Sequence, residues 1–121
     1  VIDMSTINPT ESDKIRTALE KKNISMIDAP VGRTSKEARE GKSLLMVGAS
    51  KTDFETVRPL FDLLGDTIVD CGGPGMGSRM KIVNNYMTTV LNVLSGEVLT
   101  LARAVGLKQS TCIDVFASID L

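Results

Sequence analysis

The sequence has 121 residues, 42% of them hydrophobic, with 14 Lys and Arg against 15 Asp and Glu for a net charge of −1. This length and composition are typical of about one globular domain. The balanced charge, with one Tyr, three Phe and no Trp, argues against a nucleic-acid-binding surface. The absence of His excludes any mechanism or zinc site that needs an imidazole from this chain.

Cysteine usage and hydropathy indicate a compartment. Cys71 and Cys112 form neither a CxxC motif nor a disulfide framework, so we expect a reducing, cytoplasmic environment. We expect no metal, because the common zinc sites need histidine. We also expect no membrane segment and no signal peptide, because the chain lacks a run of roughly 18 apolar residues and a leader pattern. The chain opens without Met and is expected to end within a helix at residues 120–121, so we expect a piece of a longer protein.

The first 29 residues predict a strand, a helix and a second strand. Val1–Met4 is a short apolar strand, and Asn8, followed by Pro and then by Glu two residues later, predicts a capped helix start. The helix is expected to run to about residue 22, with an apolar face formed by Ile15, Ala18 and Leu19. Residues 24–29 are apolar and β-branched, which predicts a second strand parallel to the first, ended by Pro30.

The next segment predicts two more strands around a helix. Residues 32–41 are polar with a short helix near 35–39, and a third strand follows at 44–47. A capping box at Ser50–Asp53 opens a helix that ends at Gly65. The apolar positions of this helix follow the 3.6-residue period: Phe54, Val57, Leu60, Phe61 and Leu64. A fourth strand is expected at residues 67–71.

The glycine-rich stretch 72–75 separates the α/β pattern from an all-helical one. From residue 75 to about 105 there is no proline, which predicts one helix of about 30 residues, roughly 46 Å long. A further helix is expected near 108–119. The long helix is apolar on several faces, so we expect other helices, or a second copy in a homo-oligomer, to cover it.

Two glycine motifs do not match known phosphate-binding patterns. Gly41-Lys42-Ser43 lacks the earlier glycine of a P-loop, because Lys stands at position 36, and a strand follows it. The segment 73–77 lacks the third glycine of a dinucleotide fingerprint, because Ser stands at position 78. Two interpretations of 72–77 stay open: a flexible connection, or a glycine-lined approach that presents the start of the long helix to a ligand.

A polar stripe follows one face of the long helix at helical spacing. Its members are Lys81, Asn84, Asn85, Thr88 and Asn92. A solvated surface face is one interpretation. The other is a substrate site, because amides and a hydroxyl orient a polar substrate, and an amine beside apolar residues loses solvation and gains a lower pKa, which suits a general acid/base.

Two loops after predicted strand ends are further candidates, because ligands of open α/β sheets bind beyond the carboxyl ends of strands. Gly32-Arg33-Thr34-Ser35 carries an arginine that could pair with a carboxylate, phosphate or sulfonate, or could be an ordinary exposed loop residue. Ser5 and Thr6 precede a helix and could act as simple helix caps.

Three motifs together resemble the 3-hydroxyisobutyrate dehydrogenase or β-hydroxyacid dehydrogenase family. They are Asp28-Ala29-Pro30-Val31 with Glu37-Ala38 and Gly41, then Gly72–Gly77, then Lys81–Asn85. The resemblance spans nearly the whole chain and implies an α/β fold followed by an all-α one. Residues 1–73 would be the C-terminal part of a Rossmann-type NAD(P)-binding domain, and 74–121 the long helix and start of a helical domain.

The resemblance also implies roles for the candidate residues. Lys81 would be the catalytic general acid/base that protonates a carbonyl oxygen while NAD(P)H delivers hydride, with no metal. Asn84 and Asn85 would hold the substrate, with Thr88 on the same face. The substrate would be a small anionic aldehyde or hydroxy acid. Ser5 and Thr6 would approach the nicotinamide end of NAD or NADP, Thr6 above all.

The substrate class depends on one departure from the family pattern. Most members have Val-Ser-Gly-Gly after the proline, whereas this chain has Val31-Gly32-Arg33-Thr34. This run resembles the branch of the family that reduces 3-sulfolactaldehyde to 2,3-dihydroxypropane-1-sulfonate, and implies that Gly32, Arg33 and Thr34 bind a sulfonate. The alternatives are 3-hydroxyisobutyrate, tartronate semialdehyde or succinate semialdehyde, and, in a different class, a non-catalytic helical assembly module.

The cofactor-binding machinery of the family is incomplete in this chain. The glycine-rich fingerprint, the acidic ribose contact and a second lysine are absent from the sequence. We therefore expect the chain alone to be inactive.

Overall fold

The computed structural model describes residues 1–119, and Asp120 and Leu121, where we expected helix, lie outside the described residues. The chain divides into two compact units, Val1–Asn84 and Asn85–Leu121. The first unit is a sheet with helices, and the second is helical. This confirms the predicted succession of an α/β and an all-α part.

The first unit contains a mixed five-stranded sheet. Its strands are β1 (Ile2–Asp3), β2 (Ile27–Asp28), β3 (Val31–Gly32), β4 (Leu44–Gly48) and β5 (Thr67–Gly72). β1 pairs with β2 in parallel, as expected for the opening strand-helix-strand unit. β4 pairs with β5 in parallel as well. β4 runs antiparallel to β2 and β3, which the sequence pattern did not predict. β2 and β3 both pair with the same strand, β4, and Pro30 lies between them. Because proline has no amide hydrogen, it cannot donate a hydrogen bond to β4 at this point.

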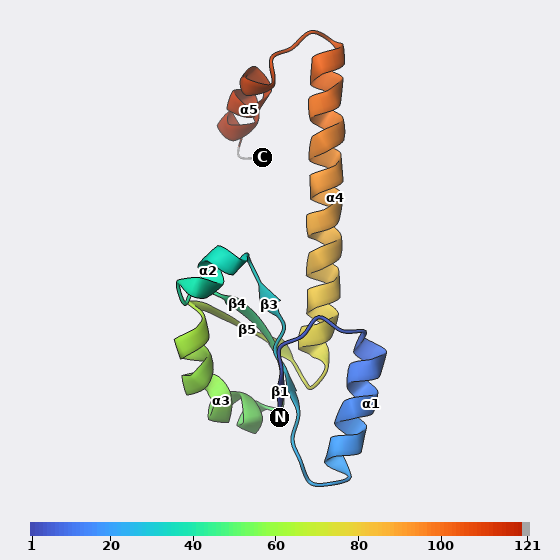
Figure 1. Ribbon diagram of the computed structural model, residues 1–121, viewed down its shortest axis with the longest axis vertical. Helices are drawn as coiled ribbons and strands as arrows, with labels where there is room; N and C mark the ends of the chain where they lie inside the picture. The colour runs from blue at the N-terminus through green and yellow to red at the C-terminus, as the bar shows by residue number, and fades with distance from the viewer. Residues whose placement is uncertain (120–121) are drawn as a thin grey trace. The chain divides into compact units, whose positions relative to one another are not determined.

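The first unit contains three helices in addition to the start of α4 (Met76–Ala104); the first and third begin where the capping residues predict, and the second lies at the short helix expected near residues 35–39. These three helices are α1 (Pro9–Glu20), α2 (Ser35–Arg39) and α3 (Lys51–Leu64), and Figure 1 shows the sheet between α1 and α3. The Asn8 side chain accepts from the Thr10 N–H at 2.9 Å, and the Ser50 hydroxyl accepts from the Asp53 N–H at 3.1 Å. Gly65 ends α3 as expected, and a Cβ there would lie 2.2 Å from the Ser43 carbonyl oxygen, so only glycine fits.

The core lies between the sheet and α3. Its buried members are Ile27, Ala29, Leu45, Val47, Ala49 and Phe61. Phe54 and Val57 of α3 pack against this cluster, whereas Leu60 and Leu64, which share their periodicity, are 47% and 37% exposed. The hydrophobic period therefore predicted the buried face of α3 except at its edge.

The predicted apolar face of α1 is wrong. Ile15 is 48% exposed and Ala18 is exposed, while Ser12 is the buried residue of this helix. Instead, α1 directs Asp13 toward Arg79, at the start of the helix that follows the sheet. Of the predicted face, Leu19 alone is half-buried, so the apolar period does not identify the buried side of α1.

Phe61 is expected to contribute strongly to stability because its side chain is 0% exposed. Phe61→Ala should lower the free energy of unfolding by about 3 to 5 kcal/mol, through lost burial and the cavity left behind. Leu63, on the same helix, is 78% exposed, so Leu63→Ala should change it by less than about 0.5 kcal/mol. Urea titrations of the three proteins test this, and similar losses for both variants would contradict it.

The long predicted helix is confirmed as α4 (Met76–Ala104, 29 residues), which begins in the first unit and continues through the second. The second unit also contains α5 (Gln109–Ser118). Apolar side chains of α4, α5 and the connection between them line a hollow of about 400 Å³. Leu101, Val105 and Phe116 are among the lining residues. Over residues 1–119, no helix is both long and apolar enough to cross a membrane.

Candidate active site

Lys81 lies on α4 beside the segment that follows β2. Its side chain is half-buried, and its Nζ donates to the Val31 carbonyl oxygen at 2.7 Å. The next stripe residues, Asn84 and Asn85, are also half-buried, whereas Thr88 is exposed. The stripe is therefore not one uniformly solvated face, and its amine is held against a specific backbone oxygen.

The start of α4 is held by a carboxylate of the sheet. The Gly75 N–H donates to Asp28 Oδ1 and the Ser78 N–H to Asp28 Oδ2, each at 2.6 Å, and Asp28 is only 3% exposed. A carboxylate at a helix N-terminus satisfies backbone donors that have no intrahelical partner. Both of these N–H groups have an internal acceptor, so they are not groups that the glycine stretch would present to a ligand.

Arg33 adopts a left-handed backbone conformation with φ of 66° and directs its guanidinium toward the start of β5. Nη1 donates to Asp66 Oδ1 at 2.5 Å and to the Lys42 carbonyl at 2.6 Å, and Nη2 donates to the Thr67 hydroxyl at 2.8 Å. The Thr67 hydroxyl and then the Arg33 guanidinium hold the pKa of Asp66 below its ordinary value. Arg33 is therefore a partly exposed arginine in an ion pair, with an anionic oxygen already at its guanidinium.

The neighbours of Arg33 are structural as well. Gly32 is buried in β3 opposite Leu44. Thr34 is the N-cap of α2, where its hydroxyl bonds to Glu37 in a capping box. The structure thus places the Val31–Thr34 run beside Lys81 through the Val31 carbonyl, but it does not turn the Arg33 or Thr34 side chains into one cluster with the lysine.

Ser5 and Thr6 follow β1 and are exposed. Because β1 and β2 are parallel, with Asp3 opposite Asp28, Ser5 and Thr6 follow β1 next to the carboxyl end of β2, where the chain continues through residues 29–30 into β3 along β4. Asn8 caps α1, so the hydroxyls of Ser5 and Thr6 are not its N-cap. These hydroxyls lie in the connection between β1 and α1.

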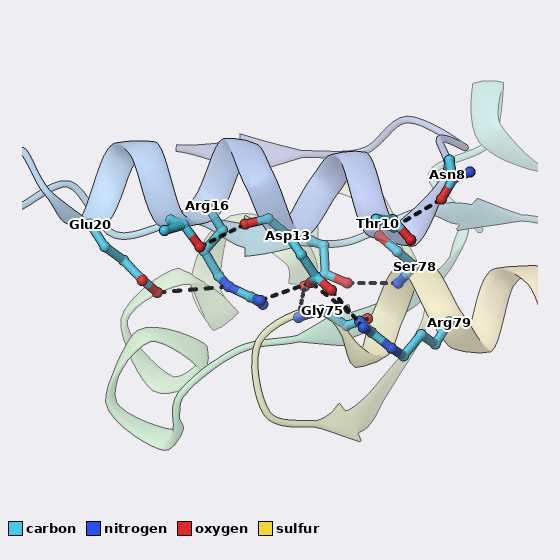
Figure 2. A network of polar contacts seen from close by, with 10 residues as sticks. Asn8, Thr10, Asp13, Arg16, Glu20, Gly75, Ser78 and Arg79 are labelled. Carbon is cyan, nitrogen blue, oxygen red and sulfur yellow. Dashed lines mark hydrogen bonds and ion pairs between the residues drawn. The ribbon is translucent and has the colours of Figure 1, made fainter.

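A charged network joins α1 to the first turn of α4 (Figure 2). Arg79 Nη2 donates to Asp13 Oδ2 at 2.6 Å, and Arg16 Nη2 donates to Asp13 Oδ1 at 2.8 Å. Arg16 also lies 3.7 Å from Glu20. Arg79 Nη1 donates to the Gly75 carbonyl at 2.9 Å, so the network reaches the turn that precedes the helix.

Asp13 predicts a small pH-dependent contribution to stability. The hydrogen bond from Arg79, and then the charges of Arg16 and Arg79, hold the pKa of Asp13 below its ordinary value of 3.8. A pKa lowered by folding gives stability that is present above the unfolded-state value and lost as pH falls through the folded-state value. The side chain is 29% exposed, so Asp13→Asn should cost less than about 1 kcal/mol near neutral pH.

The check is a denaturant titration of wild type and Asp13→Asn at neutral pH and again below the lowered pKa. The difference in the free energy of unfolding should shrink toward zero at the acidic pH. A difference of the same size at both pH values would contradict the assignment to the ionised carboxylate.

Sequence reasoning assigned no role to two groups of the site: the Asp28 carboxylate and the Val31 carbonyl. A single signal pointed to Asp28, a carboxylate within the apolar run of residues 26–31, but its acceptor role depends on α4 packing there. The carbonyl of Val31 carries no sequence signal. Among residues 1–119, no group of three or more Cys, Asp and Glu side chains is placed to hold a metal ion.

Comparisons with known proteins agree on one family. Residues 1–73 match the NAD binding domain of 6-phosphogluconate dehydrogenase. The chain is 42% identical over 117 residues to the 3-sulfolactaldehyde reductase of Escherichia coli (strain K12), covering 97% of this chain and 39% of that protein. It is 35% identical over 111 residues to the 2-(hydroxymethyl)glutarate dehydrogenase of Eubacterium barkeri, covering 92% and 37%.

Solved structures support the same fold. The 3-hydroxyisobutyrate dehydrogenase of Mycobacterium tuberculosis, solved with L-serine, matches with a TM-score of 0.92 at 29% identity, over 97% of this chain and 40% of that one. This chain spans about two fifths of the length of the curated relatives described above.

Proposed function

The chain belongs to the 6-phosphogluconate dehydrogenase-like family that includes the 3-hydroxyisobutyrate dehydrogenases, and we propose on that premise that it is part of a hydroxyacid dehydrogenase. The enzyme would transfer hydride between NAD(H) and a small hydroxy acid or its aldehyde. NADP is the alternative cofactor, because the residues that would distinguish it are not in this sequence. Residues 1–73 would complete the cofactor domain, and 74–121 would begin a helical domain that also forms a homo-oligomer.

The half-buried Lys81 amine on the Val31 carbonyl is the observation that carries this proposal. A lysine fixed by one acceptor keeps its remaining N–H groups in defined directions, as a proton donor to a reacting oxygen requires. A solvated face of an assembly module would not need such a contact. The geometry therefore favours a catalytic role for the stripe over the non-catalytic alternative.

Each residue then has one task in the reaction. When bound, the nicotinamide supplies the hydride to the carbonyl carbon. Lys81 gives its proton to the carbonyl oxygen, and the Val31 carbonyl orients the amine. Asn84 and Asn85 orient the substrate, with Thr88 further along the same helix. Ser5 and Thr6 hold the nicotinamide end of the cofactor at the shared edge of β1 and β2.

We assign 3-sulfolactaldehyde as the substrate, reduced to 2,3-dihydroxypropane-1-sulfonate. The 42% identity to a relative of that specificity supports this assignment. The Gly32-Arg33-Thr34 run supports it as well, because a guanidinium pairs well with a tetrahedral oxyanion. In this assignment the Arg33 guanidinium exchanges its Asp66 partner for the sulfonate, which requires the arginine side chain to turn from the start of β5 toward Lys81. 3-Hydroxyisobutyrate, tartronate semialdehyde and succinate semialdehyde are the alternative substrates.

A substrate panel tests the proposal on the full-length protein that carries this sequence. Initial rates of NADH and NADPH oxidation are measured with 3-sulfolactaldehyde and with the two semialdehydes, and NAD reduction with 3-hydroxyisobutyrate. We expect the highest kcat/KM for 3-sulfolactaldehyde with NADH. A higher kcat/KM for one of the carboxylates would replace the substrate assignment, and no turnover with any of them would contradict the proposed function.

A further inference from the structure

We propose that Asp28 is a positioning residue for the reaction: its carboxylate holds the first turn of α4 on the sheet and thereby sets where the Lys81 amine lies. The inference rests on the proposed function, because it takes Lys81 as the proton donor. The hydrogen bonds of the Asp28 carboxylate go to backbone N–H groups and not to the Lys81 amine. Asp28 acts through the backbone of the helix.

The segment from Asp28 to Val31 contacts α4 at two points. Asp28 accepts the Gly75 and Ser78 N–H groups with its two oxygens, each at 2.6 Å. Three residues along the same segment, the Val31 carbonyl accepts from Lys81 Nζ at 2.7 Å. Lys81 follows Ser78 by three residues, which is nearly one helical turn and a rise of about 4.5 Å along the helix. A shift of the first turn therefore moves the lysine relative to its acceptor.

The backbone around these bonds leaves the helix no room to move toward the sheet. A Cβ at Gly77 would lie 2.3 Å from the Met46 carbonyl oxygen and 2.6 Å from the Asp28 carbonyl oxygen. A Cβ at Gly48, opposite Asp28 in the sheet, would lie 2.6 Å from the Gly77 nitrogen and 2.6 Å from Asp28 Oδ1. Two glycines thus let the helix lie directly on β2 and β4, and the carboxylate holds it there.

A second carboxylate restrains the same turn from the other side. Asp13 of α1 pairs with Arg79, as Figure 2 shows, and a Cβ at Gly75 would lie 2.9 Å from Asp13 Oδ1. This pair is exposed on the surface, with 44% of the Arg79 side chain accessible, whereas Asp28 is buried. Asp28 is therefore the stronger restraint and Asp13 the weaker one.

The test is a double-mutant cycle of Asp28→Asn and Lys81→Met in the full-length protein, with kcat, the KM for NADH and the Tm measured for each variant. Asn keeps the shape of Asp but offers one oxygen and places an NH2 against the second backbone N–H. With Lys81 present, we expect kcat to fall about tenfold, since displacements of about 1 Å cost up to 10²-fold. The KM for NADH should change less than about threefold.

In the Lys81→Met background, the same Asp28→Asn change should alter kcat by less than about twofold, because the group that it positions is gone. The loss of Tm should be equal in both backgrounds. Asp53→Asn is the matched control, since its carboxylate lies at the first turn of α3, where Oδ2 accepts from the Ser50 hydroxyl at 2.7 Å. That variant should lower Tm and leave kcat unchanged.

Equal fold-losses of kcat for Asp28→Asn in the two backgrounds would overturn the proposal and leave Asp28 a structural cap. Failure of the proposed function is a separate result, in which Lys81→Met itself retains kcat. If Asp28→Asn does not fold, Arg79→Met carries the test, because it removes from the same turn an exposed ion pair with Asp13 and a hydrogen bond to the Gly75 carbonyl. It should lower kcat about threefold with Lys81 and not without it; a change that is the same or absent in both backgrounds overturns the proposal.

Discussion

Lys81→Met is expected to lower kcat by about 10²- to 10⁴-fold in the full-length protein, the range typical of a lost general acid/base. Met keeps much of the length and the apolar stem of Lys but has no proton to give and no donor for the Val31 carbonyl. Because the lost interaction is needed mainly in the transition state, kcat and kcat/KM should fall together. Steady-state rates of NADH oxidation measure both.

The control for this prediction is Lys51→Met, which changes an exposed lysine at the start of α3. It should leave kcat within about twofold of wild type, because surface substitutions away from the site cause small changes. Lys81→Arg should recover little activity, since a guanidinium stays protonated. A Lys81→Met variant with more than half of wild-type kcat would remove Lys81 from the mechanism.

Arg33→Ala is expected to lower kcat/KM for 3-sulfolactaldehyde by about 10- to 150-fold, which corresponds to about 1.5 to 3 kcal/mol for a lost charge-assisted pair. The loss should appear mainly in KM, because the sulfonate is remote from the reacting carbon, with kcat falling too if the contact aligns the aldehyde. Arg33→Lys should recover only part, since an ammonium lacks the planar fork of donors.

Asp66→Asn separates substrate binding by Arg33 from its structural ion pair. Both Arg33→Ala and Asp66→Asn remove the ion pair between the guanidinium and the Asp66 carboxylate, but only the first removes the guanidinium. If Arg33 binds the sulfonate, Asp66→Asn should keep kcat/KM within about threefold of wild type. Equal losses in the two variants, or losses below threefold for Arg33→Ala on both sulfonate and carboxylate substrates, would make Arg33 a structural loop residue.

Local patterns predicted most elements of this fold. Asn8 and Ser50 marked the starts of α1 and α3, because their side chains accept backbone N–H groups close by in sequence. The absence of proline over a long apolar stretch predicted α4. Such signals depend on residues within a few positions of one another, which is why they can be identified in a single sequence.

The misjudged features depend on residues that are far apart in sequence. On α1, Ser12 is buried and Ile15 is exposed, and the neighbouring Asp13 pairs with Arg79, 66 positions away. The antiparallel direction of β4 depends on how α2 returns the chain to the sheet. Asp28 gains its role only when α4 packs on β2, 47 to 50 positions later. Sequence reasoning found the lysine of the site and missed the groups that hold it.

Deuterium transfer from [4-²H]NADH tests whether the enzyme moves hydride to a carbonyl carbon with Lys81 as the proton donor. The full-length protein is incubated with NADH deuterated at the transferred position, in separate reactions with 3-sulfolactaldehyde and with a carboxylate semialdehyde, and the products are analysed by mass spectrometry. The account predicts that the alcohol product carries one deuterium, on the former carbonyl carbon, and that Lys81→Met forms the same labelled product far more slowly. Alcohol without deuterium, or no NADH consumption with either substrate, would contradict it.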